Sequence, residues 1–266
     1  MPPTQQAKAE AFRALHEGEP FLIPNPWDAG SARVLEALGF RALATTSGGF
    51  AFTLGRLDGE VTLDEVAEHT QALDQASSLP VAVDLENGYG PAPEDAARAI
   101  TRAAEAGAVG GSIEDWDPNA GIYEPSHAAE RVAAAAEAAR ALDFPFTFTA
   151  RAENFLRRNP DLDDTIARLK AYEDAGADVL YAPGLSSGEQ ISAVAEATTK
   201  PLNVLAFPPL TMDEITQAGG QRISVGSQLT WVAAGALARA AEEIRGTGRF
   251  DAFAERVPIK EWLGRK

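Results

Sequence analysis

The chain repeats one pattern of hydrophobic and polar positions from residue 21 to residue 245. Each cycle has a short apolar run, a turn with polar residues or glycine, and an alanine-rich stretch with helical periodicity. Continuous apolar runs of this length are typical of strands that are buried on both faces. Their alternation with helices predicts a parallel sheet that is covered by helices.

Eight such cycles follow an amphipathic helix predicted at residues 4–16. The apolar runs, with the turns that end them, are Phe21–Asp28, Arg41–Gly49, Val81–Gly90, Gly110–Trp116, Phe146–Arg151, Val179–Ala182, Leu202–Ala206 and Ile223–Val225. The helices are predicted at Ala29–Leu38, Leu63–Ser77, Pro93–Ala106, Ser126–Leu142, Leu162–Ala175, Gly188–Ala197, Met212–Ala218 and Leu229–Arg245. Eight βα units predict a (β/α)₈ barrel of the TIM type. A doubly wound open sheet is the alternative, but no Gly-x-Gly-x-x-Gly follows the first strand.

One domain is therefore expected over residues 1–266, with the barrel in 1–245 and a C-terminal helical extension in 246–266. The extension contains large apolar residues, namely Phe250, Phe253, Val257, Ile259 and Trp262. A segment this apolar is expected to pack on the barrel or on a neighbouring subunit.

Composition narrows the class of protein. The chain has 266 residues, of which 45% are hydrophobic and 23% are charged, as in a globular domain. Its net charge of −16 argues against nucleic acid and anionic membranes as partners, and it makes binding of a divalent cation plausible. The absence of cysteine excludes disulfides, thiolate metal sites and a cysteine nucleophile. The N-terminal residues lack the apolar core of a secretory signal, and no apolar run is long enough to span a membrane, so a cytoplasmic location is expected.

The candidate chemistry begins with two acidic residues after the third strand. Asp84 and Glu86 are two positions apart, so on an extended chain their side chains point to the same side. Carboxylates side by side repel each other unless a cation lies between them, although both could simply be solvated. Glu114 follows the next strand and is expected to converge on the pair. Ligands that are all oxygen favour a hard cation, Mg²⁺ or Mn²⁺.

The other strand ends add polar residues, because the active site of this fold lies at the carboxyl ends of the strands. They present Asn25, Trp27, Asp28, Thr45, Thr46, Ser47, Gly48, Gly49, Asn87, Asp115, Arg151, Glu153, Asn154, Tyr181, Asn203, Gly226, Ser227 and Gln228. Arg151 suits a carboxylate or phosphonate, or it could pair with Glu114 or Glu153 to fill the barrel mouth. Ser47-Gly48-Gly49 could offer backbone N–H groups to an anion, or be only a turn.

The three histidines, His16, His69 and His127, fall on predicted helices away from the strand ends. We expect them at the surface. A Ser/His/Asp hydrolase and a histidine-ligated zinc site are therefore disfavoured.

The pattern resembles the isocitrate lyase/phosphoenolpyruvate mutase superfamily over nearly the whole chain. The segments that carry the resemblance are Asn25–Ala32, Thr45–Gly49, Asp84–Gly90, Ile113–Asp115 and Thr149–Arg151. The resemblance implies Mg²⁺, with Asp84 as its direct ligand and Glu86 and Glu114 holding it through water. It also implies helix-swapped dimers that assemble into a homotetramer, which would account for the apolar tail.

The resemblance also assigns roles to other positions of this chain. Asp58 matches an acidic residue that reaches back over the metal. Arg151 matches the arginine that contacts the anionic groups of the substrate. The segment that binds the 2-oxo acid is matched by Thr45, Ser47, Gly48 and Gly49, and the strand-end residues Trp27 and Asn203 complete the candidate substrate-binding set.

The sequence departs from the family at the loop after the fourth strand. Residues 116–125 contain no Cys, Lys or His, whereas the lyases carry a cysteine acid/base there and the mutases a Lys-Thr-Asn-Ser type loop. The glutamate that the lyases have after the sixth strand is also missing. Isocitrate lyase, methylisocitrate lyase and phosphoenolpyruvate mutase activities are therefore disfavoured.

The retained residues predict a Mg²⁺-dependent lyase, or a decarboxylase or hydrolase. The substrate would be a small 2-oxo or 2-hydroxy di- or tricarboxylate, cleaved through a metal-stabilised enolate. Proton transfer is assigned to Tyr123, Glu124 or a metal-bound water, with no choice among them. One alternative is a phosphonopyruvate-type C–P hydrolase in which Asp58 helps water to attack. The other is a non-catalytic binder of a 2-oxo acid such as 2-oxoglutarate.

Overall fold

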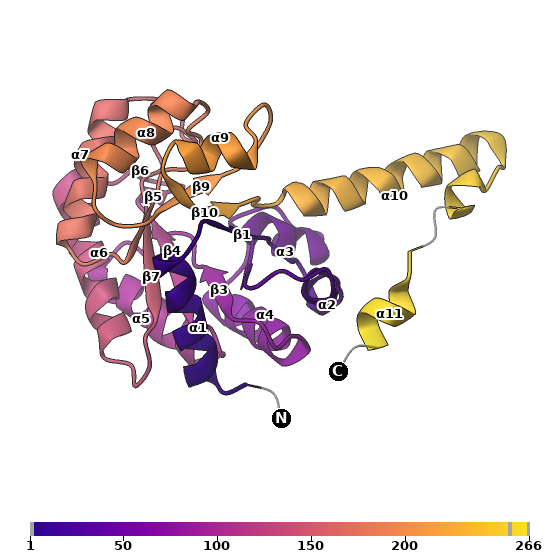
Figure 1. The fold of residues 1–266 in the computed structure, drawn as a ribbon, viewed down its shortest axis with the longest axis horizontal. Coiled ribbons are helices and arrows are strands. Elements are labelled where there is room, and N and C mark those ends of the chain that lie inside the picture. The colour runs from indigo at the N-terminus through magenta and orange to yellow at the C-terminus, as the bar shows by residue number, and fades with distance from the viewer. Residues whose placement is uncertain (1–2, 255–256, 265–266) are drawn as a thin grey trace.

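Eight parallel strands form a nearly closed barrel in the computed structural model, which describes residues 3–254 and 257–264 (Figure 1). The strands are β1 (Phe21–Ile23), β2 (Leu43–Ala44), β3 (Val81–Asp84), β4 (Gly110–Glu114), β7 (Thr147–Arg151), β8 (Val179–Tyr181), β9 (Leu202–Leu205) and β10 (Gly220–Ser224). Their order around the sheet is β1-β10-β9-β8-β7-β4-β3-β2. The Ala44 amide donates to the Pro24 carbonyl (3.1 Å) where β2 approaches β1. The TIM-type barrel is therefore confirmed, and the open doubly wound sheet is wrong.

Helices surround this barrel at nearly the predicted positions. They are α1 (Gln5–Glu17), α2 (Ala29–Ala37), α3 (Ser47–Thr53), α4 (Leu63–Ala76), α5 (Pro93–Glu105), α6 (Pro125–Arg140), α7 (Leu162–Asp174), α8 (Gly188–Ala197), α9 (Met212–Gln217), α10 (Gln228–Thr247) and α11 (Ile259–Gly264). Short polar side chains fix several starts: Thr62 and Glu65 form a capping box at α4, and Asp161 caps α7.

Two elements lie in segments that the sequence pattern assigned to loops. Ser47-Gly48-Gly49 is the first turn of α3 rather than a free turn, because the Thr46 hydroxyl accepts from the Gly49 amide (3.3 Å) and caps the helix. A small hairpin, β5 (Trp116–Asp117) and β6 (Gly121–Ile122), stands in the loop that departs from the family pattern. Both elements are too short to show a periodicity of their own.

The C-terminal part leaves the barrel at α10. Figure 1 shows α10 projecting away from the strands, and α11 lying beside α2. In α10 only Thr230 is buried, whereas Trp231, Val232 and Leu237 are exposed. The Arg33 guanidinium in α2 donates to the Leu263 carbonyl in α11 (2.6 Å). Exchange of these helices between subunits and the homotetramer stay predictions.

Two of the three histidines are buried, so their expected surface location is wrong. His16 is 9% exposed; its Nδ1 lies 2.9 Å from the Phe12 carbonyl, and its Nε2 lies 3.3 Å from the Arg222 guanidinium. His69 is stacked on Phe50, with ring centroids 4.0 Å apart. Burial lowers the pKa of His16 to about 3 and that of His69 to about 4, so both are neutral near pH 7.

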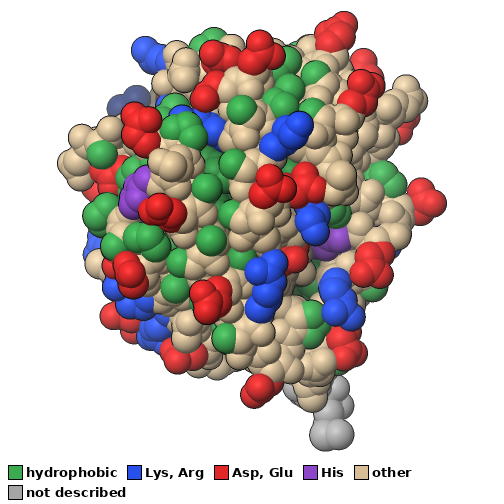
Figure 2. Space-filling view, turned by 90° about the vertical axis from the view of Figure 1, so that its left-hand side faces the viewer, with side chains coloured by type: hydrophobic (Ala, Val, Ile, Leu, Met, Phe, Trp, Pro, Cys, Tyr) green, Lys and Arg blue, Asp and Glu red, His purple; other side chains and the backbone are tan. Residues whose placement is uncertain are grey.

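The chain is acidic, with a net charge of −16, and many of its charged side chains lie at the surface (Figure 2). On the face shown in Figure 2, Asp and Glu side chains are spread among Lys and Arg. Within the described ranges, none of the helices combines the length and the apolar character needed to cross a bilayer.

Candidate active site

The three strands β3, β4 and β7 end in charged residues at the same end of the barrel. Asp84, Glu114 and Arg151 are the last residues of these strands, and Glu114 lies opposite Arg151 in the parallel register. The apolar residues before them bury each strand, so its first charged residue falls where the strand emerges. The predicted convergence of these residues is therefore present.

Arg151 is the centre of an ion-pair network. Its Nη1 lies 3.0 Å from Asp84 Oδ1, and its Nη2 lies 2.9 Å from Glu114 Oε2 and 2.7 Å from Glu153 Oε1. Burial alone would lower the pKa of Arg151, but the charges of Glu153, Glu114 and Asp84 raise it well above its ordinary value. Pairing with Glu114 and Glu153, the alternative in the sequence analysis, is thus present, and it includes Asp84 as well.

A strongly acidic cavity of about 380 Å³ adjoins this network. Its wall includes Asp58, Glu86, Glu114, Trp116 and Asp117. Burial raises the pKa of Glu86 to about 7, and the negative charges of Asp84 and Asp58 add to the shift. Burial likewise raises the pKa of Asp58, against the lowering effect of a hydrogen bond with the Ser47 side chain. The loop residue Asp58 therefore joins the strand-end carboxylates, as the resemblance implies.

The backbone at Glu86 is unusual. Its φ is +47°, in the left-handed region that a residue with a β-carbon rarely adopts. Two hydrogen bonds of the Glu86 backbone hold it in this conformation. The Glu86 carbonyl accepts from the Glu114 amide (2.8 Å), and the Glu86 amide donates to Asp84 Oδ1 (3.3 Å). Strain of this kind is concentrated at functional sites.

The donor set fits a hard divalent cation. Asp58, Asp84, Glu86 and Glu114 offer only oxygen atoms. Burial raises the pKa values of Asp58, Glu86 and Glu114, and repulsion from neighbouring carboxylates, including Glu153 beside Glu114, adds to the shifts. A bound cation would relieve that repulsion. Within residues 3–254 and 257–264, no three such side chains are already gathered as a metal site. Such close gathering is not required when one carboxylate binds the cation directly and the others bind it through water molecules.

The predicted substrate segment lies beside Asp84. The Thr45 hydroxyl accepts from the Asp84 amide (2.8 Å), and the Ser47 amide points at Asp84 Oδ2 (3.4 Å). Gly48 and Gly49 are required by packing: a Cβ on Gly48 would lie 2.9 Å from Ser227 Oγ. The side chain of Trp27 packs next to Gly49, the last residue of this segment.

Asn203 lies deeper, in the wall of an interior cavity of about 70 Å³ that Thr45, Asp84 and Arg151 also line. Its amide nitrogen donates to Ser224 Oγ (3.0 Å), and its oxygen accepts from Arg222 Nε (2.8 Å). The Asn203 side chain is thus bonded within the barrel, and its contact with substrate stays a prediction.

The two acid/base candidates differ in position. The Tyr123 hydroxyl lies 3.4 Å from Asp117 Oδ2 and 3.5 Å from Asn87 Nδ2, next to the acidic cavity. Burial raises the pKa of Tyr123. Glu124 is exposed at the start of α6.

Arg157, which no sequence pattern indicated, also pairs with the carboxylates at the barrel mouth. Its Nη2 lies 3.1 Å from Glu114 Oε1, and its Nε lies 3.3 Å from Glu153 Oε2. Arg157 is six positions after Arg151 in the sequence, and no motif links the two residues. The fold of the loop after β7 brings Arg157 to the site.

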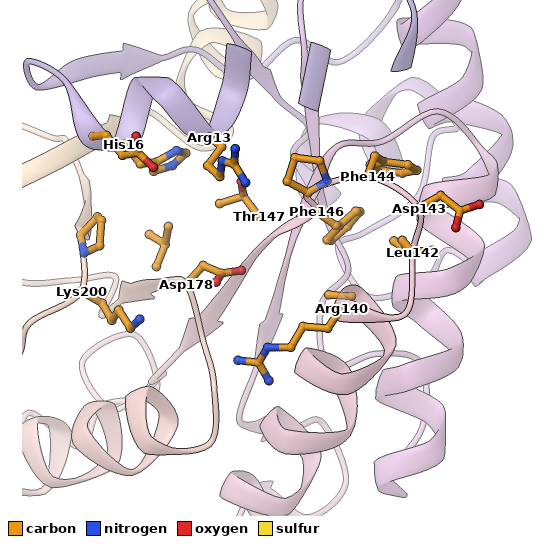
Figure 3. A pocket seen from close by; sticks show the side chains of 15 residues that line it. Arg13, His16, Arg140, Leu142, Asp143, Phe144, Phe146, Thr147, Asp178 and Lys200 are labelled. Carbon is orange, nitrogen blue, oxygen red and sulfur yellow. The ribbon is translucent and has the colours of Figure 1, made fainter. Parts of the chain in front are cut away.

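A larger cavity, of about 600 Å³, lies at the opposite end of the barrel (Figure 3). Thr147 at the start of β7 and Asp178 just before β8 form part of its wall, together with Arg13, Arg140 and Lys200. In this fold the amino ends of the strands carry stability, and the carboxyl ends carry the chemistry. The smaller acidic cavity is therefore the candidate active site.

The fold and the site together define a class of protein: a TIM-type barrel with several carboxylates and two arginines at the carboxyl end of the strands. The profile of the phosphoenolpyruvate phosphomutase family matches residues 12–245, so the chain belongs to that family, within the isocitrate lyase/phosphoenolpyruvate mutase superfamily. The superfamily resemblance is thus confirmed, and its members are lyases and mutases, which supports an enzyme.

Individual relatives cover most of the chain. Oxaloacetate decarboxylase of Bradyrhizobium sp. is 33% identical, over 85% of this chain and 80% of the relative. The 2-methylisocitrate lyase of Halalkalibacterium halodurans is 30% identical, over 98% of this chain and 90% of the relative. A crystal structure from Burkholderia cenocepacia J2315, provisionally assigned as a lyase/mutase, has a TM-score of 0.95 and 51% identity, and the match covers 98% of this chain and 97% of that one.

Proposed function

We propose that this protein is a Mg²⁺-dependent lyase or decarboxylase of small 2-oxo or 2-hydroxy di- and tricarboxylates. The observation that carries the proposal is the excess of carboxylates at the barrel mouth. Among the described residues, no ion pair joins Asp58 or Glu86 to an arginine, whereas Asp84 and Glu114 share Arg151. Buried like charges are costly without a cation. The relatives that act on oxaloacetate and 2-methylisocitrate support the substrate class.

Each residue of the site is assigned a role in binding the cation or the substrate. Asp84 would hold the cation directly, and Glu86, Glu114 and Asp58 would hold its water. When bound, Mg²⁺ supplies Lewis acidity for the negative charge that develops on the 2-oxo acid as the bond to C3 breaks. Arg151 would orient the anionic end of the substrate beside the Ser47 amide.

Proton transfer falls to the side chains that border the acidic cavity. Neither Tyr123 nor Glu124 lines that cavity itself, but the Tyr123 hydroxyl lies 3.4 Å from Asp117 and 3.5 Å from Asn87, which both line it, whereas Glu124 is exposed. We therefore favour Tyr123 over Glu124, with a metal-bound water as the remaining candidate.

The test is a coupled assay for pyruvate, glyoxylate and phosphate over a panel of 2-oxo acids, with and without MgCl₂. We expect Mg²⁺-dependent turnover that falls at least about a hundredfold in Asp84→Asn, because loss of a metal ligand costs several kcal/mol of transition-state stabilisation. Asp143→Asn, which removes one charge at the opposite end of the barrel, is the matched control. Equal turnover of D84N and wild type would refute the proposal.

The same panel separates the two alternatives. Asp58 borders the acidic cavity, so water attack on phosphonopyruvate remains a second candidate, and it predicts release of phosphate. A non-catalytic binder predicts thermal stabilisation by 2-oxoglutarate with MgCl₂, and no product from any compound of the panel.

A further inference from the structure

A second guanidinium stands at the barrel mouth beside Arg151. Arg157 lies between β7 and α7, and its Cζ is 3.4 Å from the centroid of the Trp116 ring. A guanidinium so close to an indole face is stacked on it, which is the strongest of the aromatic cation–π contacts. Trp116 begins the hairpin in the loop of residues 116–125, which departs from the family pattern. The stacking of Arg157 on Trp116 therefore depends on this divergent loop.

The stacked guanidinium retains unused donors. Its Nε and Nη2 pair with Glu153 and Glu114, which are 0% and 6% exposed. The Arg157 side chain itself is 32% exposed, and no bond from its Nη1 occurs among the described residues. Arginine carries five N–H donors, so Arg157 can accept an anionic group from the solvent side without leaving its two partners.

Arg151 is less available for such a group. Its side chain is only 11% exposed, and it already pairs with Asp84, Glu114 and Glu153. The rest of the cavity wall is acidic, since Asp58, Glu86 and Asp117 line it. The second anionic group of a substrate would be repelled by that wall and attracted by Arg157, which pairs with the cavity residue Glu114 and stacks on the cavity residue Trp116.

We propose that Arg157, held flat on Trp116, binds the second anionic group of the substrate and gives the enzyme a preference for dianionic over monoanionic 2-oxo acids. The inference rests on the proposed function, because it assumes that the first carboxylate and the 2-oxo group bind near Asp84. It assigns to one side chain the recognition of the remote half of the substrate. A fixed, planar guanidinium suits a carboxylate, which it can bind through two parallel hydrogen bonds.

The test measures binding rather than turnover. Affinities for two pairs of equal chain length, oxaloacetate with 2-oxobutanoate and 2-oxoglutarate with 2-oxopentanoate, are determined by calorimetry in MgCl₂ for wild type and variants. We expect wild type to prefer one or both dianions by about tenfold or more, as a charge-assisted hydrogen bond provides. Arg157→Gln should remove that preference and leave the affinity for the monoanion within about threefold.

Two further variants keep the result interpretable. Arg157→Lys retains the charge but not the planar fork, so the preference should fall only in part, and Trp116→Leu should weaken it by removing the stacking surface. Arg158→Gln, the same change of charge one residue along, is the matched control and should behave as wild type. An unchanged preference in both Arg157 variants, or an equal loss in R158Q, would overturn the proposal. Wild type that binds no 2-oxo acid would refute the proposed function itself.

Discussion

The buried His16 makes the stability of the barrel depend on pH in a way that one substitution isolates. His16 contacts Phe12 and Phe21 edge-on, and its Nε2 faces the guanidinium of Arg222, which is 6% exposed. The apolar phenylalanine rings do not solvate a protonated imidazole, and the positive charge of Arg222 repels one. We therefore predict that His16→Gln removes an acid-sensitive contribution to the free energy of unfolding.

The magnitude follows from the shift in pKa. The pKa of His16 is lowered from 6.5 to about 3, chiefly by burial, so the unfolded chain binds a proton below pH 6.5 that the folded chain refuses. This contribution is fully present above pH 6.5 and is lost as the pH falls toward 3. Linkage gives roughly 1.4 kcal/mol per pH unit in that window, or about 2 kcal/mol between pH 7 and pH 5.

Other groups titrate in the same range, so only the difference between proteins is informative. The pKa of Glu86 is raised to about 7, and protonation of that carboxyl restores stability as the pH falls, which opposes the effect of His16. This term is common to wild type and H16Q and cancels when the two are subtracted. The predicted quantity is therefore the stability of wild type minus that of H16Q.

The assay is urea unfolding at pH 7 and pH 5, followed by tryptophan fluorescence. The stability of wild type relative to H16Q should fall by about 2 kcal/mol between the two pH values. His127→Gln, a substitution at the half-exposed His127, should differ from wild type by within about 0.5 kcal/mol at both. A wild-type minus H16Q difference that does not change with pH would refute the reasoning.

Two further substitutions test buried contacts of the barrel. Gly49→Ala should lower the unfolding free energy by about 1–3 kcal/mol, because its Cβ would lie 2.5 Å from Thr46 Cγ2, whereas Gly30→Ala meets no atom closer than 3.4 Å and serves as the control in thermal melts. Tyr172→Phe removes the hydroxyl that donates to buried Asp115 (2.5 Å) and should cost about 1–3 kcal/mol in urea unfolding; an unchanged midpoint would contradict that bond.

The fold could be predicted because its signals are local. Most strands are buried on both faces, so their sequences contain an apolar run, and most helices begin at a polar cap or a proline. The start of β10, Gly220-Gln221-Arg222, contains no apolar run and lies outside the strand predicted at Ile223–Val225. The places that escaped prediction are short: α3, with seven residues, and the hairpin from Trp116 to Ile122. A segment of this size makes too few periodic contacts to be distinguished from a loop.

The strand ends by themselves determined which residues meet at the barrel mouth, since Asp84, Glu114 and Arg151 follow directly from the boundaries of parallel strands. Only the tertiary structure decided how they pair. Arg151 and Arg157 share Glu114 and Glu153, and Asp58 comes back over the site from a loop of its own. Those contacts join residues that lie far apart in the chain or that carry no periodic signal, and their strength depends on burial, which a linear pattern does not encode.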